Sequence, residues 1–331
     1  MYYFCTFFDH RYLDRGLALY RSLQEHCSSF RLWILCMDQL SYDTLSQMSL
    51  SNAHLIALED FERGDEELLK AKQNRTLIEY YFTCTPSLPL FILKNWPEID
   101  MITYLDSDLF FFADPAPVYD EIANHSIAII AHRFPPATRH FENHGIYNVG
   151  WISFKHDEYG LTCLRWWRGR CIEWCYTRYE DGRFADQKYL DDWPTRFQNV
   201  IVLEHKGANL ANWNLANYEV QLVDENQILV DEQPLIFYHF HGLKRVTSWL
   251  YNPNLTVHGA KLTKVIRENI YFPYVWTLSN VIPEDYQLPD VLLRSYGSRW
   301  LLYLNRMLRL PFIFKDILTG NYLFVRKGRV V

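Results

Sequence analysis

Several features that would define other classes of protein are missing from this sequence of 331 residues. No run of about 20 apolar residues occurs, and no basic segment precedes the first hydrophobic stretch at residues 2–8. The seven cysteines are odd in number and are never spaced Cys-x-x-Cys, which argues against both a disulfide framework and a structural zinc site. We therefore expect a soluble, cytoplasmic protein with reduced cysteines.

The glycine motifs that bind phosphate are also absent. Because neither Gly-x-Gly-x-x-Gly nor a Walker sequence occurs, a bound phosphate would have to be held by metal and side chains, which disfavours dehydrogenases and kinases. Hydrophobic residues make up 49% of the chain, which is enough for a large core. Aromatic residues, at 17%, are abundant enough to line a sugar-binding site as well.

The most informative stretch is residues 101–112, an apolar run that contains Asp106 and Asp108. Removing two carboxylates from water is costly unless a cation compensates, so this pair at the end of a buried strand indicates a divalent metal that holds a diphosphate. In an extended strand the two side chains face the same way and would reach one ion. The alternative is a pair of aspartates that stabilises a turn without metal.

Strand and helix patterns alternate through the first part of the chain. We expect strands over residues 2–8, 30–37 and 54–58, and helices over residues 15–27, 42–48, 68–82 and 86–95, before the strand that carries the aspartates. This alternation predicts an α/β fold whose ligand lies beyond the carboxyl ends of the strands.

Five short motifs then occur in an order that is known from an enzyme family. They are Asp9-x-x-Tyr12, the Tyr-Leu-Asp-Ser-Asp sequence that ends at Asp108, Asn148-Val-Gly150, Asp186-Gln187 and His239-x-x-Gly242. Over roughly residues 1 to 250 this set resembles the GT-A-fold glycosyltransferases, nearest to glycosyltransferase family 8. The resemblance implies a Rossmann-like mixed sheet flanked by helices, and transfer of a sugar from a nucleotide-diphosphate sugar, with a UDP-sugar favoured, to a glycan or glycolipid acceptor.

The resemblance also implies roles for individual residues. Mn²⁺ or Mg²⁺ would be held by Asp106, Asp108 and His239, the nucleotide sugar would be bound by Asp9, Tyr12, Arg75 and Ser107, and the donor sugar would be met by Asn148, Asp186 and Gln187. The family's His-x-x-Gly-x-x-Lys-Pro-Trp motif is incomplete here, because Arg245 takes the lysine position and Pro-Trp is absent. Lys244 or Arg245 would supply the cation for the diphosphate.

Stereochemistry and acceptor remain open at this point. Retention by front-face attack, with Gln187 beside the reacting carbon, is favoured over inversion, which would need Asp186, Asp191 or Asp192 as a base. The candidate acceptor-binding residues combine amide groups with a ring, and a turn-rich connection is the alternative for them. They are Asn209, Asn212 and Trp213.

Charge is distributed unevenly. Residues 291–331 carry eight basic and one acidic residue, a net charge of +7, whereas the first 290 residues have a net charge of −13. We divide the chain into a catalytic domain (1–250), with a nucleotide-binding half (1–115) and an acceptor half (116–250), and a helical extension (251–331) that is basic from residue 291. Residues 292–309 have the pattern of a basic amphipathic helix, which predicts peripheral binding to an anionic membrane, or else packing on the body. The acidic body disfavours nucleic acid.

Two other classes of function are also compatible with the sequence. A metal-dependent phosphoesterase or nucleotidyltransferase also uses paired aspartates, and a nucleotide-sugar-binding protein without catalysis would show the same donor site. The Asn148-Val-Gly150 and Asp186-Gln187 motifs favour transfer over both.

Overall fold

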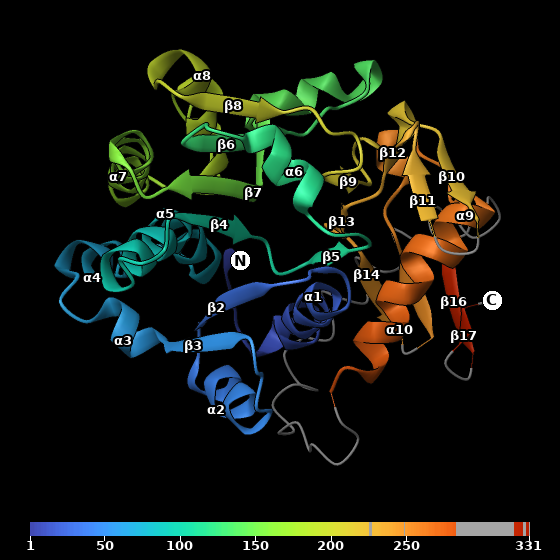
Figure 1. Ribbon diagram of the computed structural model, residues 1–331, viewed down its shortest axis with the longest axis horizontal. Coiled ribbons are helices and arrows are strands. Elements are labelled where there is room, and N and C mark those ends of the chain that lie inside the picture. The colour runs from blue at the N-terminus through green and yellow to red at the C-terminus, as the bar shows by residue number, and fades with distance from the viewer. Residues whose placement is uncertain (225–226, 248, 283–320, 327–328, 331) are drawn as a thin grey trace, which may run out of the picture.

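The computed structural model describes residues 1–224, 227–247, 249–282, 321–326 and 329–330 (Figure 1). The basic segment 292–309 lies outside these residues, so its contact with a membrane stays a prediction. Within the described part of the chain, no helix has the length and apolar character needed to cross a bilayer.

A seven-stranded sheet forms the centre of the protein. Its strands are β1 (Tyr2–Phe8), β2 (Phe30–Cys36), β3 (Ala53–Ala57), β4 (Met101–Leu105), β6 (Ile127–Ala131), β7 (Tyr147–Lys155) and β8 (Val200–Leu203). They lie in the order β3-β2-β1-β4-β7-β6-β8, and β7 alone runs against its neighbours. The helices of this region are α1 (Leu13–His26), α2 (Gln39–Gln47), α3 (Leu58–Glu62), α4 (Glu66–Lys72), α5 (Leu77–Asn95), α6 (Ala116–Ile122), α7 (Glu158–Glu173) and α8 (Trp193–Arg196). The predicted mixed α/β sheet flanked by helices is confirmed.

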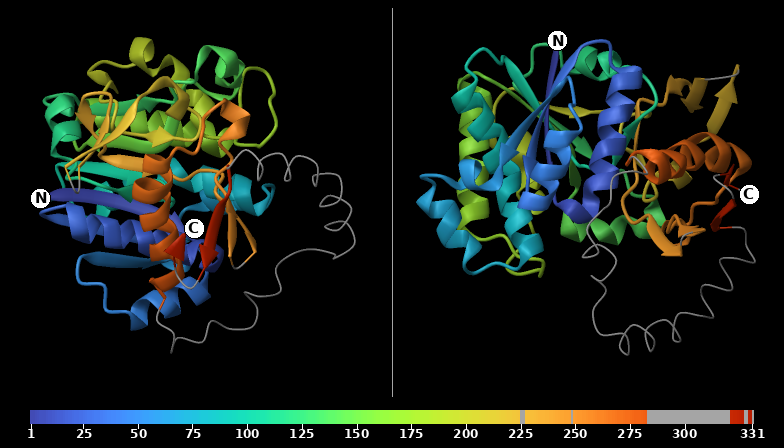
Figure 2. Two further views of the ribbon diagram at one scale, coloured as in Figure 1. Left: turned by 90° about the vertical axis from the view of Figure 1, so that its right-hand side faces the viewer. Right: turned by 90° about the horizontal axis from the view of Figure 1, so that it is seen from below.

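Both faces of the main sheet are buried, because alternate residues of each strand enter two separate cores. In β1, Cys5 and Phe7 lie in the core formed with α5 and α7, whereas Phe4 and Phe8 lie in the core formed with α1 and α6. Figure 2 shows these two helical layers on opposite sides of the sheet. Gly16 allows α1 to lie directly against β1, since a Cβ at this position would be 2.1 Å from the Phe8 ring.

Smaller sheets are gathered on the right-hand side of Figure 1. The first consists of β5 (Leu109–Phe111), β13 (Phe237–His239) and β9 (Leu210–Ala211), and the second of β10 (Val220–Val223), β11 (Gln227–Val230) and β12 (Gln233–Pro234). The third consists of β14 (Lys244–Thr247), β15 (Leu250–Asn252), β16 (Leu323–Arg326) and β17 (Arg329–Val330). A continuous helical stretch comprises α9 (Lys264–Ile266), a π-helical turn (Arg267–Tyr271) and α10 (Phe272–Asn280), which packs against α1.

The proposed domain boundary at residue 250 falls inside the third small sheet. β14 and β15 form an antiparallel pair across it, and β16 pairs with β15 from the far end of the chain. The region after residue 250 therefore contains strands as well as the helices that the sequence predicts. The division into a catalytic domain and an extension stays a prediction.

The helix boundaries before β4 differ from those expected. Separate helices were expected over residues 68–82 and 86–95, but α5 runs through Pro86 and Pro89, and the break falls earlier, at Thr76. Thr76 begins α5 with a capping box, which fixes that start. The two prolines are buried, so tertiary packing holds the helix together where their missing N–H groups would weaken it.

Glu79 ties the start of α5 to the segment that follows α7. One carboxylate oxygen accepts hydrogen bonds from the backbone and hydroxyl of Thr76 (2.9 and 2.8 Å), and the other accepts from the same two groups of Thr177 (3.0 and 3.1 Å). Burial opposes ionisation, yet these four hydrogen bonds lower the pKa of Glu79 to about 2.

We predict that Glu79→Gln lowers the free energy of unfolding by about 2 kcal/mol at pH 7, because an amide group replaces an acceptor oxygen with a donor. The folded-state pKa lies below the ordinary value of 4.5, so this stabilisation is present above about pH 4.5 and is lost as the pH falls towards 2. Urea unfolding from pH 7 to pH 3 measures it, with Glu98→Gln at an exposed position as the control. A difference that stays constant on acidification would contradict the charge argument.

Candidate active site

Asp106 and Asp108 lie in a turn between β4 and β5, not in one continuous strand as the sequence suggested. The turn is closed by a hydrogen bond from the Leu109 N–H to the Asp106 carbonyl (3.2 Å). The Tyr104 hydroxyl donates to one carboxylate oxygen of Asp106 (2.9 Å). A turn therefore brings the two acids together at the carboxyl edge of the main sheet, where ligands of open α/β sheets bind.

His239 reaches this turn because β13 pairs with β5. The pairing sets His239 opposite Leu109, and the Phe240 N–H donates to the Asp108 carbonyl (3.0 Å). The His239 Nε2 atom lies 3.0 Å from a carboxylate oxygen of Asp108 and 3.6 Å from one of Asp106. The structure thus brings together the three residues that the resemblance assigns to a metal.

The other ring nitrogen of His239 is held by Asn148. The Asn148 Oδ1 atom accepts from the Gly150 N–H (3.0 Å) and lies 3.2 Å from His239 Nδ1. His132 lies behind it, with Nδ1 3.2 Å from the Ile146 carbonyl and Nε2 3.3 Å from Asn148 Nδ2. Proton donation from each Nδ1 satisfies all of these contacts, so a neutral His239 would present an Nε2 lone pair to the carboxylates.

Gly150 makes room for this arrangement. A Cβ at residue 150 would be 2.5 Å from Asn148 Oδ1 and 2.7 Å from His239 Nδ1. The Asn148-Val-Gly150 motif therefore has a physical reason, because the asparagine holds His239 and the glycine lets its ring approach β7. The resemblance placed Asn148 near the donor sugar, and its hydrogen bond to His239 was not expected from the sequence.

The charges of this cluster control one another's protonation. Burial opposes the ionisation of Asp108, but His239 and Arg15 hold its pKa well below the ordinary range. Burial raises the pKa of Asp106, His239 opposes this, and the charge of Asp108 adds to it. Burial alone would lower the pKa of His239, and the two carboxylates raise it above its ordinary value. The protonation of each of these three groups therefore depends on the charges of the other two.

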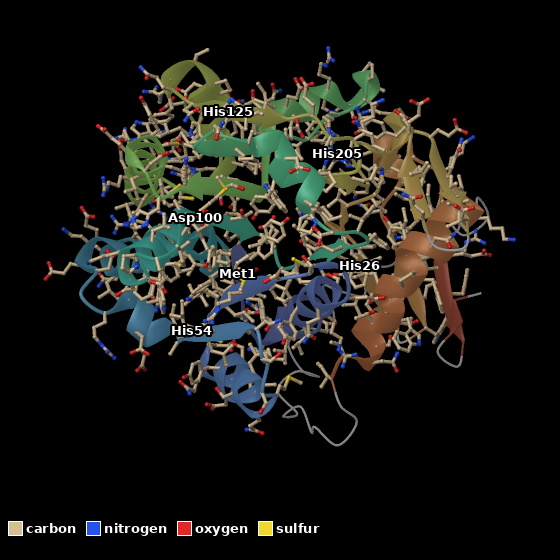
Figure 3. The ribbon with its side chains drawn as sticks, in the orientation of Figure 1. Met1, His26, His54, Asp100, His125 and His205 are labelled. Carbon is tan, nitrogen blue, oxygen red and sulfur yellow. The ribbon has the colours of Figure 1, made fainter. Side chains whose placement is uncertain are left out.

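The donor set of this cluster fits a divalent cation. Carboxylate oxygens with an imidazole nitrogen suit Mn²⁺, and the hydrogen bond at His239 Nδ1 leaves Nε2 as the ligand atom. His241 adds a further imidazole, since ligand atoms of Asp108, His239 and His241 all lie within 4.8 Å of one another. The sequence did not predict that His241 belongs to this cluster. Among the histidines labelled in Figure 3, His26 lies on α1, His54 on β3, and His125 and His205 in loops, so none of them comes from β13.

Arg15 is a candidate functional residue that the sequence reasoning missed. It lies in the first turn of α1, with Nη1 3.5 Å from a carboxylate oxygen of Asp108. Its Nη2 donates to the Leu243 carbonyl (2.9 Å), and its guanidinium lies 4.5 Å from the ring centre of Tyr12. Its position three residues after Tyr12 was the available signal, because that motif marks the helix start that borders the site.

The other predicted donor-binding residues differ in their surroundings. Asp9 follows β1 at the same edge, is buried, and accepts from Arg11 and from the Tyr81 hydroxyl (2.9 Å). Tyr12 is exposed beside Arg15. Ser107 is half-buried between the two aspartates. Their contact with a nucleotide stays a prediction.

The three predicted cations do not contact the aspartate pair in the described structure. Arg75 donates to the Tyr176 hydroxyl (2.6 Å) and the Ile172 carbonyl (3.1 Å), so it holds the end of α7. Lys244 and Arg245 are exposed on β14, and Arg245 lies over the ring of Tyr251. Binding of the donor or its diphosphate by these three residues stays a prediction, and the cation beside Asp108 is Arg15.

Asp186 and Gln187 lie side by side in sequence but in different environments. Asp186 is buried, and burial together with the charge of Asp106 raises its pKa to about 7, although a hydrogen bond from Thr85 opposes the shift. The Gln187 side chain donates to the His144 carbonyl (3.0 Å). Asp186 is therefore the member of the pair that senses the charge of the aspartate cluster.

The predicted acceptor residues are all buried. Asn212 donates weakly to the Asn254 carbonyl (3.5 Å), and Asn209 to the Ala131 carbonyl (3.5 Å). Trp213 packs edge-on against both His239 and His241, with ring centres 5.0 and 5.5 Å apart. The ring of Trp213 thus packs against two of the candidate ligands. An acceptor role for Asn209, Asn212 and Trp213 stays a prediction.

Comparison with known proteins places the fold and the family. No protein-family model matches the sequence. The crystal structure of the galactosyltransferase LgtC with donor and acceptor sugar analogues superimposes with a TM-score of 0.50 at 14% identity, over 72% of this chain and 87% of that one. With the mixed sheet and its flanking helices, this shows that the fold is of the GT-A type.

Two Bacillus subtilis (strain 168) proteins, both uncharacterized, are similar in sequence. YfnD is 33% identical over 286 residues, which cover 86% of this chain and 90% of YfnD. YfnF is 35% identical over 253 residues, which cover 74% of this chain and 82% of YfnF. The chain therefore belongs to the protein family that includes YfnD and YfnF, and it carries a GT-A fold.

Proposed function

We propose that this protein is a metal-dependent glycosyltransferase of family-8 type, which moves a sugar from a nucleotide-diphosphate sugar to a glycan or glycolipid. The observation that carries the proposal is the joining of Asp106, Asp108 and His239 at the carboxyl edge of a GT-A sheet, with the cation of Arg15 beside them. The fold it shares with a galactosyltransferase supports this class of reaction. A UDP-sugar is the favoured donor.

Asp106, Asp108 and His239 would hold a divalent cation, with His241 close enough to join them. When bound, Mn²⁺ or Mg²⁺ supplies positive charge to the diphosphate as it leaves. The chain's own contribution is a desolvated, pre-oriented ligand set, because Asn148 fixes the ring of His239 and Tyr104 fixes the carboxylate of Asp106. Asp9 and Tyr12, which end β1 and precede α1, would border the nucleoside.

Retention of configuration is the favoured stereochemical course. The bond between the anomeric carbon and the diphosphate oxygen breaks, the acceptor hydroxyl attacks from the same face, and its proton passes to the departing diphosphate. The chain's part is to place the donor sugar, for which Asp186 and Gln187 are the candidates. Because its pKa is raised to about 7, Asp186 is present in both protonation states near neutral pH, and it would donate a hydrogen bond to a sugar hydroxyl or accept one from it.

The first prediction concerns donor binding. We expect one nucleotide sugar from a panel of UDP-, GDP-, CMP- and dTDP-sugars to raise the melting temperature by several degrees, only with Mn²⁺ or Mg²⁺, because ligand binding to the native state stabilises it. We also expect the wild type to hydrolyse this donor slowly and release nucleoside diphosphate. Asp108→Asn should abolish both the shift in melting temperature and this release. Asp60→Asn, which removes an exposed carboxylate, is the matched control.

Other outcomes of the same panel separate the alternatives. Release of nucleotide products without any transfer of sugar to water or acceptor would favour a phosphoesterase or nucleotidyltransferase. A metal-dependent shift without turnover in the presence of sugar acceptors would favour a binding protein. An unchanged response in Asp108→Asn would refute the proposed site.

The second prediction concerns pH. Because the pKa of His239 is raised by its two acidic neighbours, the ring keeps its proton to a higher pH than an ordinary histidine and must lose that proton to act as a ligand. Affinity for Mn²⁺ should therefore rise with pH, approaching tenfold per unit below this pKa and levelling off above it. Calorimetry in buffers of different ionisation enthalpy should detect release of the proton. His239→Gln should remove most of this dependence, whereas His54→Gln on β3 should leave it intact.

The third prediction concerns Asp186. Its folded-state pKa of about 7 lies above the ordinary 3.8, so the unfolded chain ionises first and stability is lost as the pH rises from about 4 to 7. Asp186→Asn removes this cost, which should raise the free energy of unfolding by up to about 4 kcal/mol at pH 8 in the presence of chelator, with little gain at pH 4. The same variant should lose turnover. Asp181→Asn, at an exposed position, should change neither property.

A further inference from the structure

The incomplete His-x-x-Gly motif leaves the diphosphate without an evident cation. Lys244 and Arg245, which follow that motif, are exposed on β14, and Arg245 lies 6.0 Å from the ring centre of Tyr251. In the described structure neither forms an ion pair with Asp106 or Asp108. A diphosphate leaving group gains negative charge as the glycosidic bond breaks, so a cation from elsewhere in the chain is needed.

Arg15 has the geometry that this role requires. Its side chain is 19% exposed, so it is largely desolvated but open on one side. One guanidinium nitrogen is fixed by the Leu243 carbonyl at 2.9 Å, and the plane rests against Tyr12. The other terminal nitrogen is 3.5 Å from Asp108, which is an ion-pair distance but too long for a strong hydrogen bond. Arg15 therefore keeps donors for a ligand on the side of the acids.

We propose that Arg15 binds the diphosphate of the nucleotide donor and stabilises it as a leaving group. This inference rests on the proposed function and names a residue of α1 for a task that the resemblance gives to the segment after His239. An arginine suits it, because its planar guanidinium can contact two phosphate oxygens at once and is always charged. Arg15 also links α1 to the loop at Leu243 through its hydrogen bond to that carbonyl.

A purely structural role makes a different prediction. If Arg15 only held the loop at Leu243 in place, its loss would displace the ligands and weaken every bound species, Mn²⁺ included. If Arg15 binds the diphosphate, its loss removes a positive charge near the cation site, so affinity for Mn²⁺ alone should stay equal or rise. The two roles therefore differ in the sign of one measurement.

The experiment uses the full-length protein with Mn²⁺ alone, UDP and UMP. Electron paramagnetic resonance measures Mn²⁺ affinity, and calorimetry at saturating Mn²⁺ measures the nucleotides. For Arg15→Gln we expect UDP to bind 10- to 100-fold more weakly and UMP to change less than threefold, with Mn²⁺ affinity equal or higher. Arg21→Gln is the matched control, because Arg21 is on the same helix and also donates to a backbone carbonyl, that of Val281 (3.2 Å). Arg15→Lys should lose less UDP affinity than Arg15→Gln, and it serves as the test if Arg15→Gln does not fold.

The outcomes separate this inference from the proposed function. Equal loss of UDP and UMP, together with weaker Mn²⁺ binding, would assign Arg15 a structural role and overturn the inference. Wild-type affinity for UDP in Arg15→Gln would overturn it as well, while the glycosyltransferase proposal stands. If the wild-type protein binds none of UDP, GDP, CDP and dTDP with Mn²⁺, the donor class is wrong and the inference falls with it.

Discussion

The pairing of β13 with β5 is the constraint on which the site depends. Both strands are three residues long, so few backbone hydrogen bonds define their register. Aromatic packing holds them instead. The ring of Phe237 stacks on that of Trp151 with ring centres 5.3 Å apart, and its centre lies 5.4 Å from that of the Phe111 ring. A slip of one residue would turn His239 to the opposite face and away from Asp108. The large buried rings thus serve the chemistry indirectly, because they fix the register that orients the imidazole of His239.

Further side chains around His239 fix the orientation of its ring. Asn148 and Gly150 are two residues apart on the same face of β7, which runs antiparallel to β4 and so brings its first residues to the carboxyl edge of the sheet. The side-chain oxygen of Asn148 lies at hydrogen-bond distance from Nδ1 of His239, and its side-chain nitrogen lies at hydrogen-bond distance from Nε2 of His132. Each group has few alternatives in a buried setting, because an unmatched donor or acceptor is costly there. The orientation of His239 therefore depends on the convergence of β4, β7 and β13 at this edge.

Sequence reasoning predicted the parts of this protein that depend on local pattern. The α/β class, the strands β1, β2, β3 and β4 and the aspartate pair followed from hydrophobic runs and polar interruptions. It did not predict the turn at residues 106–108 or the contact of Arg15 with Asp108, because these depend on partners distant in sequence. The resemblance supplied His239, but neither it nor the pattern indicated the hydrogen bond from His239 to Asn148. The continuation of α5 through Pro86 was missed for a related reason, since tertiary packing overrides local propensity.

The charge balance of the site connects these observations. Two neighbouring carboxylates, of which Asp108 is buried and Asp106 is partly exposed, need compensating positive charge in the folded protein whether or not a ligand is present. In the free protein, the guanidinium of Arg15 lies beside Asp108, and His239 adds a second positive charge whenever its ring is protonated. A divalent cation would replace the proton on His239 and would compensate the negative charge of Asp108. The positive charge of Arg15 would then be without an anionic partner. The diphosphate of a donor is such an anion, so metal and nucleotide would bind cooperatively without any large change of fold. Strong binding of metal and nucleotide together would then follow because Asp108 pairs with the metal and Arg15 pairs with the diphosphate.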